Sequence, residues 1–290
     1  MEMIVLKIKK CSVLTESEKN EILKLENMAF KEEQLENHAF LSNEINFDKN
    51  LECFYMAYDN NKLIGFLTTF IPTSNEAEIL AVVHPEYRQK GCFSMLFEAA
   101  KEILLRAGIK NILLVIEAKS QSGLKVLKKF KGYELEHSEY RMSYEKSDTI
   151  PEYNDLSFSE VNYENKKIFS DITLEAFNDL DENENNSFID SVIECEDREG
   201  YIAYNNDIPI GVFDYNYEDG DAFLYGVAIQ SDYRGKGFGK QLIGFALEEG
   251  LKKRNKIVLD VDSNNPIAFN LYKKCGFKID FQVDYYKYKI

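Results

Sequence analysis

The chain has 290 residues, of which 44% are hydrophobic and 13% aromatic, so two domains of ordinary size can each bury a core and a disordered chain is excluded. The net charge of −15 at pH 7 lies mostly in the second half and argues against a nucleic-acid partner, which requires a basic surface. The same charge permits a cationic substrate, although solubility explains it equally well.

The five cysteines are scattered, form no Cys-x-x-Cys pair and have no histidine nearby, so we expect reduced thiols and no metal site. The first ten residues alternate charged and apolar side chains, which is unlike a signal peptide. No run of about 18 apolar residues occurs, so no membrane span is expected. Together these features predict a cytoplasmic protein.

The first half of the chain alternates short β patterns with helical ones. Residues 3–9 predict a strand, and apolar residues spaced three and four apart predict a helix within 16–42. Three β runs follow at 54–58, 63–70 and 77–83. A long amphipathic helix to about residue 106, a buried strand at 112–116, a helix at 124–130 and two closing strands within 133–144 complete this half.

Residues 147–155 contain Pro151 and few apolar side chains, and we interpret them as a linker. The second half then repeats the order of elements. It predicts strands at 156–160, 201–204, 208–215, 223–229 and 257–261, a helical region around 168–177, helices at 237–254 and 266–275, and final strands within 277–290. The predicted domains are therefore residues 1–146 and 147–290.

One segment occurs twice, 146 residues apart, as Glu86–Phe93 (EYRQKGCF) and Asp232–Gly239 (DYRGKGFG). The same offset relates Ala57 to Ala203 and Gly65 to Gly211, which indicates a duplicated domain. A glycine-rich turn between a strand and a helix presents unpaired N–H groups to an anion, although it can also be a tight turn without a ligand. The first copy has lost two glycines, since Gln89 and Phe93 replace Gly235 and Gly239.

The glycine spacing fits neither a dinucleotide fingerprint nor a Walker loop. Instead Leu224–Gly239, with Arg-x-x-Gly-x-Gly directly after a strand, resembles the coenzyme-A signature of the GNAT acetyltransferase superfamily. Asn265–Tyr272, followed by Cys275-Gly276-Phe277, resembles the second signature of that family, Asn-x-x-Ala-x-x-Leu-Tyr…Gly-Phe. The resemblance covers residues 156–290 and, more loosely, 3–146. It implies an α/β fold of two tandem GNAT-like domains, each a mixed twisted β-sheet flanked by helices.

The resemblance also implies roles for residues of the second domain. Acetyl transfer needs an N–H donor for the oxyanion, and the family supplies it from the strand before the cradle, where Gly226 suits a bulge or a close approach of the backbone. That strand would also pair with the pantetheine arm, and the helix N-terminus would bind the diphosphate. The residues concerned are Val227, Ala228 and Ile229 for the arm, Asn265 beside it, and Arg234, Gly235, Lys236, Gly237, Phe238, Gly239 and Lys240 for the diphosphate.

Tyr272 occupies the family position of the proton donor to the thiolate leaving group; the alternative is a tyrosine that only packs in the core. The base that deprotonates the amine is not identified. Asp214 and Asp262 lie on or next to strands near the predicted site, and either could serve directly or through water, but such a residue is more often only a solvated carboxylate. Cys275 is most simply a packing residue, so no covalent nucleophile is expected.

The first domain departs from the second signature. Aligning Gly132 with Gly276 places Lys128 at the position of Tyr272 and Gln121 at that of Asn265. We therefore expect the first domain to be structural or regulatory. Whether Arg88, Gly91 and Cys92 still bind coenzyme A stays open.

The resemblance implies an acetyl-CoA-dependent N-acetyltransferase that transfers an acetyl group to a primary amine, on a small molecule or a peptide, by direct attack in a ternary complex. The alternative is a non-catalytic acyl-CoA-binding or scaffold protein. The acidic stretch 179–186 would attract a cationic acceptor or form a plain polar loop. No motif specifies the acceptor or the oligomeric state.

Overall fold

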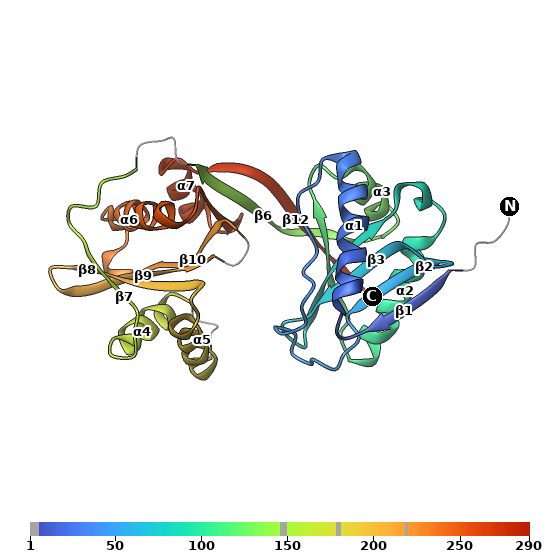
Figure 1. Ribbon diagram of the computed structural model, residues 1–290, viewed down its shortest axis with the longest axis horizontal. Coiled ribbons are helices and arrows are strands. Elements are labelled where there is room, and N and C mark those ends of the chain that lie inside the picture. Colours follow the sequence, from blue (N-terminus) through green and yellow to red (C-terminus); the bar gives the residue numbers. More distant parts are fainter. Residues whose placement is uncertain (1–5, 146–149, 178–180, 218–219) are drawn as a thin grey trace. The chain divides into compact units, whose positions relative to one another are not determined.

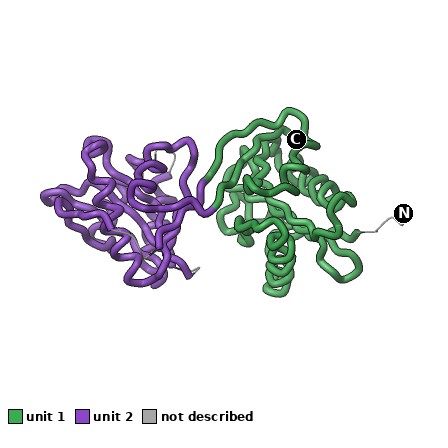
Figure 2. The backbone as a smooth tube through the Cα atoms, turned by 90° about the horizontal axis from the view of Figure 1, so that it is seen from above, with its two compact units in different colours: residues 1–139, 281–290 green, residues 140–280 purple. Residues whose placement is uncertain are grey.

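The computed structural model describes residues 6–145, 150–177, 181–217 and 220–290, and the chain forms two compact units (Figure 2). Unit 1 comprises the residues up to Glu139 together with Phe281–Ile290, and unit 2 comprises Tyr140–Asp280. Each unit is a mixed β-sheet with helices on both faces (Figure 1), which confirms the predicted α/β fold and its duplication.

Unit 1 is built on a sheet with the order β1-β2-β3-β4-β5, in which β4 and β5 are parallel and the other neighbours antiparallel. Helices α2 and α3 pack on one face, and α1 packs on the other. Its elements are β1 (Lys7–Cys11), α1 (Glu16–Glu33), β2 (Phe54–Asp59), β3 (Lys62–Phe70), β4 (Glu76–Val83), a short 3-10 turn (Pro85–Tyr87), α2 (Cys92–Arg106), β5 (Asn111–Glu117), α3 (Gln121–Leu127) and the start of β6 (Glu134–Glu145).

Unit 2 repeats this order as β7-β8-β9-β10-β11, again with one parallel pair, β10 and β11. Helices α6 and α7 bury apolar side chains against one face, and α4 and α5 against the other. Its elements are β7 (Ser157–Glu160), α4 (Lys166–Ala176), α5 (Glu182–Glu194), β8 (Arg198–Asn205), β9 (Ile208–Asn216), β10 (Ala222–Ile229), a 3-10 turn (Ser231–Tyr233), α6 (Phe238–Lys253), β11 (Lys256–Asp262), α7 (Pro266–Lys274) and the start of β12 (Lys278–Lys289).

Each unit completes its sheet with a segment from the other repeat. In unit 1 the end of β12 pairs antiparallel with β5, from Val283 opposite Glu117 to Lys289 opposite Asn111. In unit 2 the end of β6 lies beside β11, and its Met142 and Tyr144 are buried in the core. The units therefore differ from the predicted division after residue 146, because the order of elements along the chain does not reveal which repeat a strand joins.

Several predicted elements have different bounds in the structure. Helix α1 starts at a capping box formed by Thr15 and Glu18 but ends at Glu33, where Gln34 adopts a left-handed conformation, rather than continuing toward residue 42. The closing strands expected as pairs are the single long strands β6 and β12. Residues 3–5 of the first predicted strand and 147–149 of the predicted linker lie outside the described residues.

Among the helices that the structure describes, none combines the length and apolar character needed to cross a lipid bilayer.

Candidate active site

Strand β10 of unit 2 is interrupted by a bulge at Gly226. The φ angle of this residue is +61°, and the register of β10 against β9 shifts between Tyr225 and Ala228. On its other side, β10 pairs with β11 only at Ala222 and Phe223. The bulge predicted at Gly226 is confirmed. Because the pairing ends so early, the main chain of Val227–Ile229 can pair with an extended ligand along this edge.

A buried carboxyl group lies against the bulge. The Asp214 side chain, on β9, is 3% exposed, and its Oδ1 has no hydrogen-bond partner among the described residues. A Cβ atom at Gly226 would lie 2.5 Å from Asp214 Oδ2, and a Cβ atom at Gly200 would lie 3.0 Å from Asp214 Oδ1. Only glycine therefore fits at these two positions beside Asp214. Burial raises the pKa of Asp214 well above its usual range, and the Arg198 charge opposes this only in part. Asp214 is therefore a buried acid and not a solvated carboxylate.

The glycine-rich cradle leads directly into α6. Gly235 and Gly237 have φ angles of +74° and +88°, and Gly237 is the N-cap of the helix without any side-chain cap. In the described chain, the amides from Gly235 to Gly239 donate no hydrogen bond to a protein acceptor. These exposed amides at a helix N-terminus form a suitable site for a diphosphate.

Basic side chains surround these amides. Arg234 Nε donates to the carbonyl of Ile229 at 2.7 Å, which ties the arginine to the end of β10. Lys236 Nζ lies 5.1 Å from the centre of the Tyr233 ring, and the exposed Lys240 follows in the first turn of the helix. A Cβ atom at Gly239 would lie 3.2 Å from Leu271 Cδ2, so α6 and α7 meet closely at this point.

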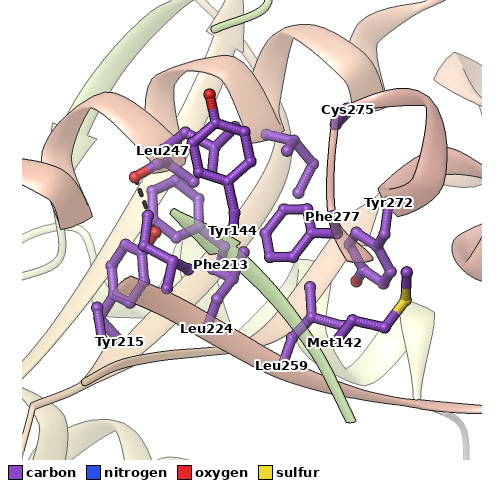
Figure 3. Packing of buried hydrophobic residues seen from close by; sticks show 14 of the residues in the cluster. Met142, Tyr144, Phe213, Tyr215, Leu224, Leu247, Leu259, Tyr272, Cys275 and Phe277 are labelled. Atoms are coloured by element: carbon purple, nitrogen blue, oxygen red, sulfur yellow. Dashed lines mark hydrogen bonds between the residues drawn. The ribbon is translucent and has the colours of Figure 1, made fainter. Parts of the chain in front are cut away.

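Helix α7 carries the two other predicted site residues. Asn265 is the N-cap, and its Oδ1 accepts from the Ala268 amide at 3.0 Å, so the asparagine at least stabilises the helix start. Tyr272 is 8% exposed and packs beside Met142 and Phe277 (Figure 3). Its hydroxyl forms no hydrogen bond with a described residue. Burial raises the pKa of Tyr272 to about 12, so the phenol stays protonated and can act as a donor.

The second carboxylate considered as a base has a local role. Asp262, at the end of β11, accepts from the Asn264 amide at 2.7 Å, and its carbonyl accepts from the Asn265 amide at 2.9 Å. It therefore shapes the turn that begins α7.

In the described part of the acidic stretch 179–186, Asp181 caps α5 by accepting from the amides of Asn183 and Glu184, while Glu182 and Glu184 are exposed. The attraction of a cationic acceptor by this stretch stays a prediction. Residues 179 and 180 lie outside the described residues.

The first copy of the cradle keeps the backbone shape of the second. Gln89 and Gly91 have φ angles of +62° and +86°, close to those of Gly235 and Gly237, and Gly91 caps α2 as Gly237 caps α6. The positive charge of Arg88 in this copy is nevertheless neutralised. Arg88 Nη1 donates to Glu32 and Glu33 at 2.8 and 2.9 Å. An anion at this cradle would have to compete with two carboxylates for the arginine.

The first copy also lacks the bulge. The pairing of β3 with β4 runs without a shift from Gly65–Val83 to Phe70–Glu78. Glu78 and Phe223 are equivalent positions, paired with Leu113 and Val258. Arg88 follows Glu78 by ten positions, whereas Arg234 follows Phe223 by eleven, and the extra residue in unit 2 is the bulge.

The helix caps correct the predicted alignment of the second signature. Ser120 caps α3 by accepting from the Gly123 amide, as Asn265 caps α7, so these two residues are equivalent and Gln121 is not. Counting from the caps places the buried Leu127, and not Lys128, at the position of Tyr272. The alignment on Gly132 was wrong because the connection between Leu127 and Gly132 is one residue longer than that between Tyr272 and Gly276. Unit 1 therefore has no phenol at this place.

The sequence matches the acetyltransferase (GNAT) family twice, over residues 19–133 and 162–277. The chain therefore belongs to this family of acetyltransferases.

Solved structures with a similar fold cover nearly the whole chain. A GCN5-related N-acetyltransferase from Sphaerobacter thermophilus has a TM-score of 0.81 at 15% identity over 98% of this chain and 95% of its own. A tandem GNAT protein from the clavulanic acid biosynthesis pathway has a TM-score of 0.71 at 13% identity over 98% of both chains. A GNAT-family acetyltransferase from Colwellia psychrerythraea has a TM-score of 0.68 at 15% identity over 98% of this chain and all of its own. At these low sequence identities, the similarity to the three structures shows a shared fold and nothing more.

Proposed function

We propose that unit 2 transfers an acetyl group from acetyl-CoA to a primary amine by direct attack in a ternary complex. An asymmetry between the units carries this proposal. Unit 2 has the strand bulge, a buried phenol and a cradle arginine, Arg234, that forms no salt bridge with a described carboxylate, although Glu175 feels its charge. In unit 1 the equivalent strand has no bulge, a leucine stands at the place of the phenol, and Arg88 is paired with Glu32 and Glu33.

The residues of unit 2 fit acetyl-CoA, which supplies an activated acetyl thioester when bound. The amides from Gly235 to Gly239 would hold the diphosphate, with Arg234 and Lys236 adding charge. The main chain of Val227–Ile229 would pair with the pantetheine arm as an additional strand, and an amide at the bulge would donate to the acetyl oxygen as negative charge develops there. The remaining donor group of Asn265 would bind the same arm.

Tyr272 would supply the proton that the thiolate needs as it leaves. The protonated state that this requires is favoured by burial, which raises the pKa of the phenol to about 12. The amine must lose a proton before it attacks. Asp214 would first have to ionise against its own desolvation in order to accept that proton, so a solvent water or another group is an equally suitable acceptor.

The test is the release of free thiol from acetyl-CoA by purified protein with a panel of small amines, amino-terminal peptides and lysine peptides. Turnover with at least one class supports the proposal. Binding of acetyl-CoA in a thermal-shift assay without turnover by any class of amine would instead support a non-catalytic acyl-CoA-binding protein. Absence of both binding and turnover would refute the two functions together.

A further inference from the structure

The buried acid Asp214 lies in a space that two glycines leave open. Its strand β9 runs between β8 and β10 (Figure 1). Asp214 is opposite Gly200 on β8 and opposite Tyr225 on β10, and Gly226 follows Tyr225 at the bulge. Because a Cβ atom at Gly226 would lie only 2.5 Å from Asp214 Oδ2, the carboxyl group is in contact with the main chain of the bulge.

The surroundings of this carboxyl group are apolar apart from one cation. A Cβ atom at Gly200 would lie 2.8 Å from Val161 Cγ1 and 3.2 Å from Phe169 Cε2 of α4, so these two side chains and Asp214 Oδ1 converge on the same place. Arg198 of β8 is the residue whose charge acts on Asp214. Asp214 Oδ1 has no hydrogen-bond partner in the described chain. A buried oxygen without a partner lowers the free energy of unfolding, so stability does not explain an acid at this position.

Unit 1 has different residues at the same places. Phe54 and Thr68 precede Gly200 and Asp214 by 146 positions and form the equivalent pair of opposite residues. Thr68 is in turn opposite Leu80 on β4, in a pairing that has no shift. The acid and the glycine beside it therefore occur in the unit that has the bulge, and a phenylalanine and a threonine occur in the unit with the regular strand.

The bulge itself adds one residue beside Asp214. Tyr225 is opposite Asp214 and Ala228 is opposite Val212, so two residues of β10 share the single position of β9 between them. A bulge of this kind keeps its shape only while the space beside it is filled, because packed strands otherwise close over a void. The Asp214 carboxyl group fills that space.

The charge of the carboxyl group matters as much as its shape. In the proposed function an amide at the bulge donates to the acetyl oxygen as negative charge develops there. A carboxylate in contact with the same main chain would oppose that charge, whereas a neutral acid does not. Burial, which raises the pKa of Asp214, favours the neutral acid.

We propose that Asp214 is a positioning residue for acetyl transfer, whose neutral carboxyl group supports the bulge at Gly226 and so directs the bulge amide toward the acetyl oxygen. This inference rests on the proposed function of unit 2 and adds a residue to it. Asp214 acts through the main chain of β10 and does not exchange a proton with the amine.

The first test is calorimetry with acetyl-CoA and with S-ethyl-CoA, which has a methylene group in place of the acetyl carbonyl. The wild type should bind acetyl-CoA about threefold to tenfold more tightly, which is the effect of one hydrogen bond. Asp214→Ala should bind both carriers equally and bind S-ethyl-CoA as the wild type does. Asp214→Asn, which is neutral and has the shape of the acid, should keep the preference for acetyl-CoA.

The second test is thiol release from acetyl-CoA with an amine of the panel described above. Asp214→Ala should lower kcat about tenfold or more and change KM for acetyl-CoA less than about fivefold, and Asp214→Asn should restore kcat to within about threefold of the wild type. Thr68→Ala is the matched control, because Thr68 is the buried equivalent of Asp214 beside a strand without a bulge. It should retain the kcat of the wild type and the preference for acetyl-CoA.

An undiminished preference for acetyl-CoA in Asp214→Ala would overturn the proposal, as would an Asp214→Asn variant that behaves like Asp214→Ala. Asp214→Thr installs the residue of unit 1, which lacks the atoms that reach Gly226, and should behave as Asp214→Ala does if the alanine variant does not fold. Equal binding of both carriers by the wild type would refute this inference alone. Absence of binding of either carrier would refute the proposed function, and this inference with it.

Discussion

The two cradles offer a matched pair of substitutions, Gly237→Val and Gly91→Val. Both glycines have φ angles near +87°, both cap the helix that follows, and a Cβ atom at either would meet nothing within 4 Å. A valine side chain at either position therefore has room, but it strains the left-handed backbone conformation. A β-branched residue held in this region costs roughly 1–3 kcal/mol, so both variants should lose a similar amount of stability.

Their effects on acetyl-CoA should differ sharply. If the valine relaxes toward an ordinary φ angle, the amides that follow turn away from the diphosphate. Loss of one charge-assisted hydrogen bond of about 1.5–3 kcal/mol corresponds to a fall in affinity of roughly tenfold to a hundredfold. Gly237→Val should show this fall, and Gly91→Val should bind as the wild type does, because Arg88 is already paired with Glu32 and Glu33.

Isothermal titration calorimetry with acetyl-CoA gives the affinity and the number of sites. Thermal unfolding of the same samples checks that the two variants lose a similar amount of stability. Unchanged affinity in Gly237→Val would refute the assignment of the diphosphate to α6. Equal loss of affinity in both variants, or two sites in the wild type, would show that unit 1 also binds the carrier.

Three further outcomes are expected. Tyr272→Phe should lower kcat by about a hundredfold with little change in KM for acetyl-CoA, since it removes a proton donor and hardly alters packing. Glu78→Gln should unfold at a higher temperature than the wild type above pH 7, with the difference vanishing toward pH 4. Burial and the neighbouring charges of Glu139 and Glu76 raise the pKa of Glu78 to about 7, so the ionised wild-type residue is a growing penalty as pH rises. Deleting Phe281–Ile290 should destabilise unit 1 and leave the unfolding of unit 2 in place, because these residues form the strand beside β5.

Each of these outcomes has its own control. Lys128→Ala, at an exposed position, should retain full activity, and equal losses in Lys128→Ala and Tyr272→Phe would contradict the proton-donor role. A pH-independent difference between Glu78→Gln and the wild type would show that Glu78 has an ordinary pKa in the folded state. Loss of both calorimetric transitions on deletion would mean that the end of β12 stabilises more than unit 1.

One residue of strand length distinguishes β10 of unit 2 from β4 of unit 1. In unit 2 the extra residue at Gly226 shifts the register, and β10 leaves β11 after two pairs. In unit 1 the pairing of β4 with β5 continues to Ile79 and Leu114. Since Glu78 and Phe223 are equivalent, the parallel pairing extends one residue further in unit 1 than in unit 2.

Features encoded locally were predictable from the sequence. The cradle of unit 2 follows from glycines whose backbone angles other residues adopt only with strain, and the bulge from a glycine within a strand pattern. The order of elements follows from hydrophobic periodicity. These interactions join residues that are close together in the chain, so their signals survive in the sequence alone.

Other features depended on which distant segments meet. The burial of Asp214, the pairing of Arg88 with α1 and the exchange of β6 and β12 leave no local pattern. Each arises from contacts between residues far apart in the chain, where burial and charge neutralisation are decided by the packed tertiary structure. The sequence by itself determined two repeats with one intact cradle, and the fold decided which carboxylates are buried, which cations are neutralised and which strand completes each sheet.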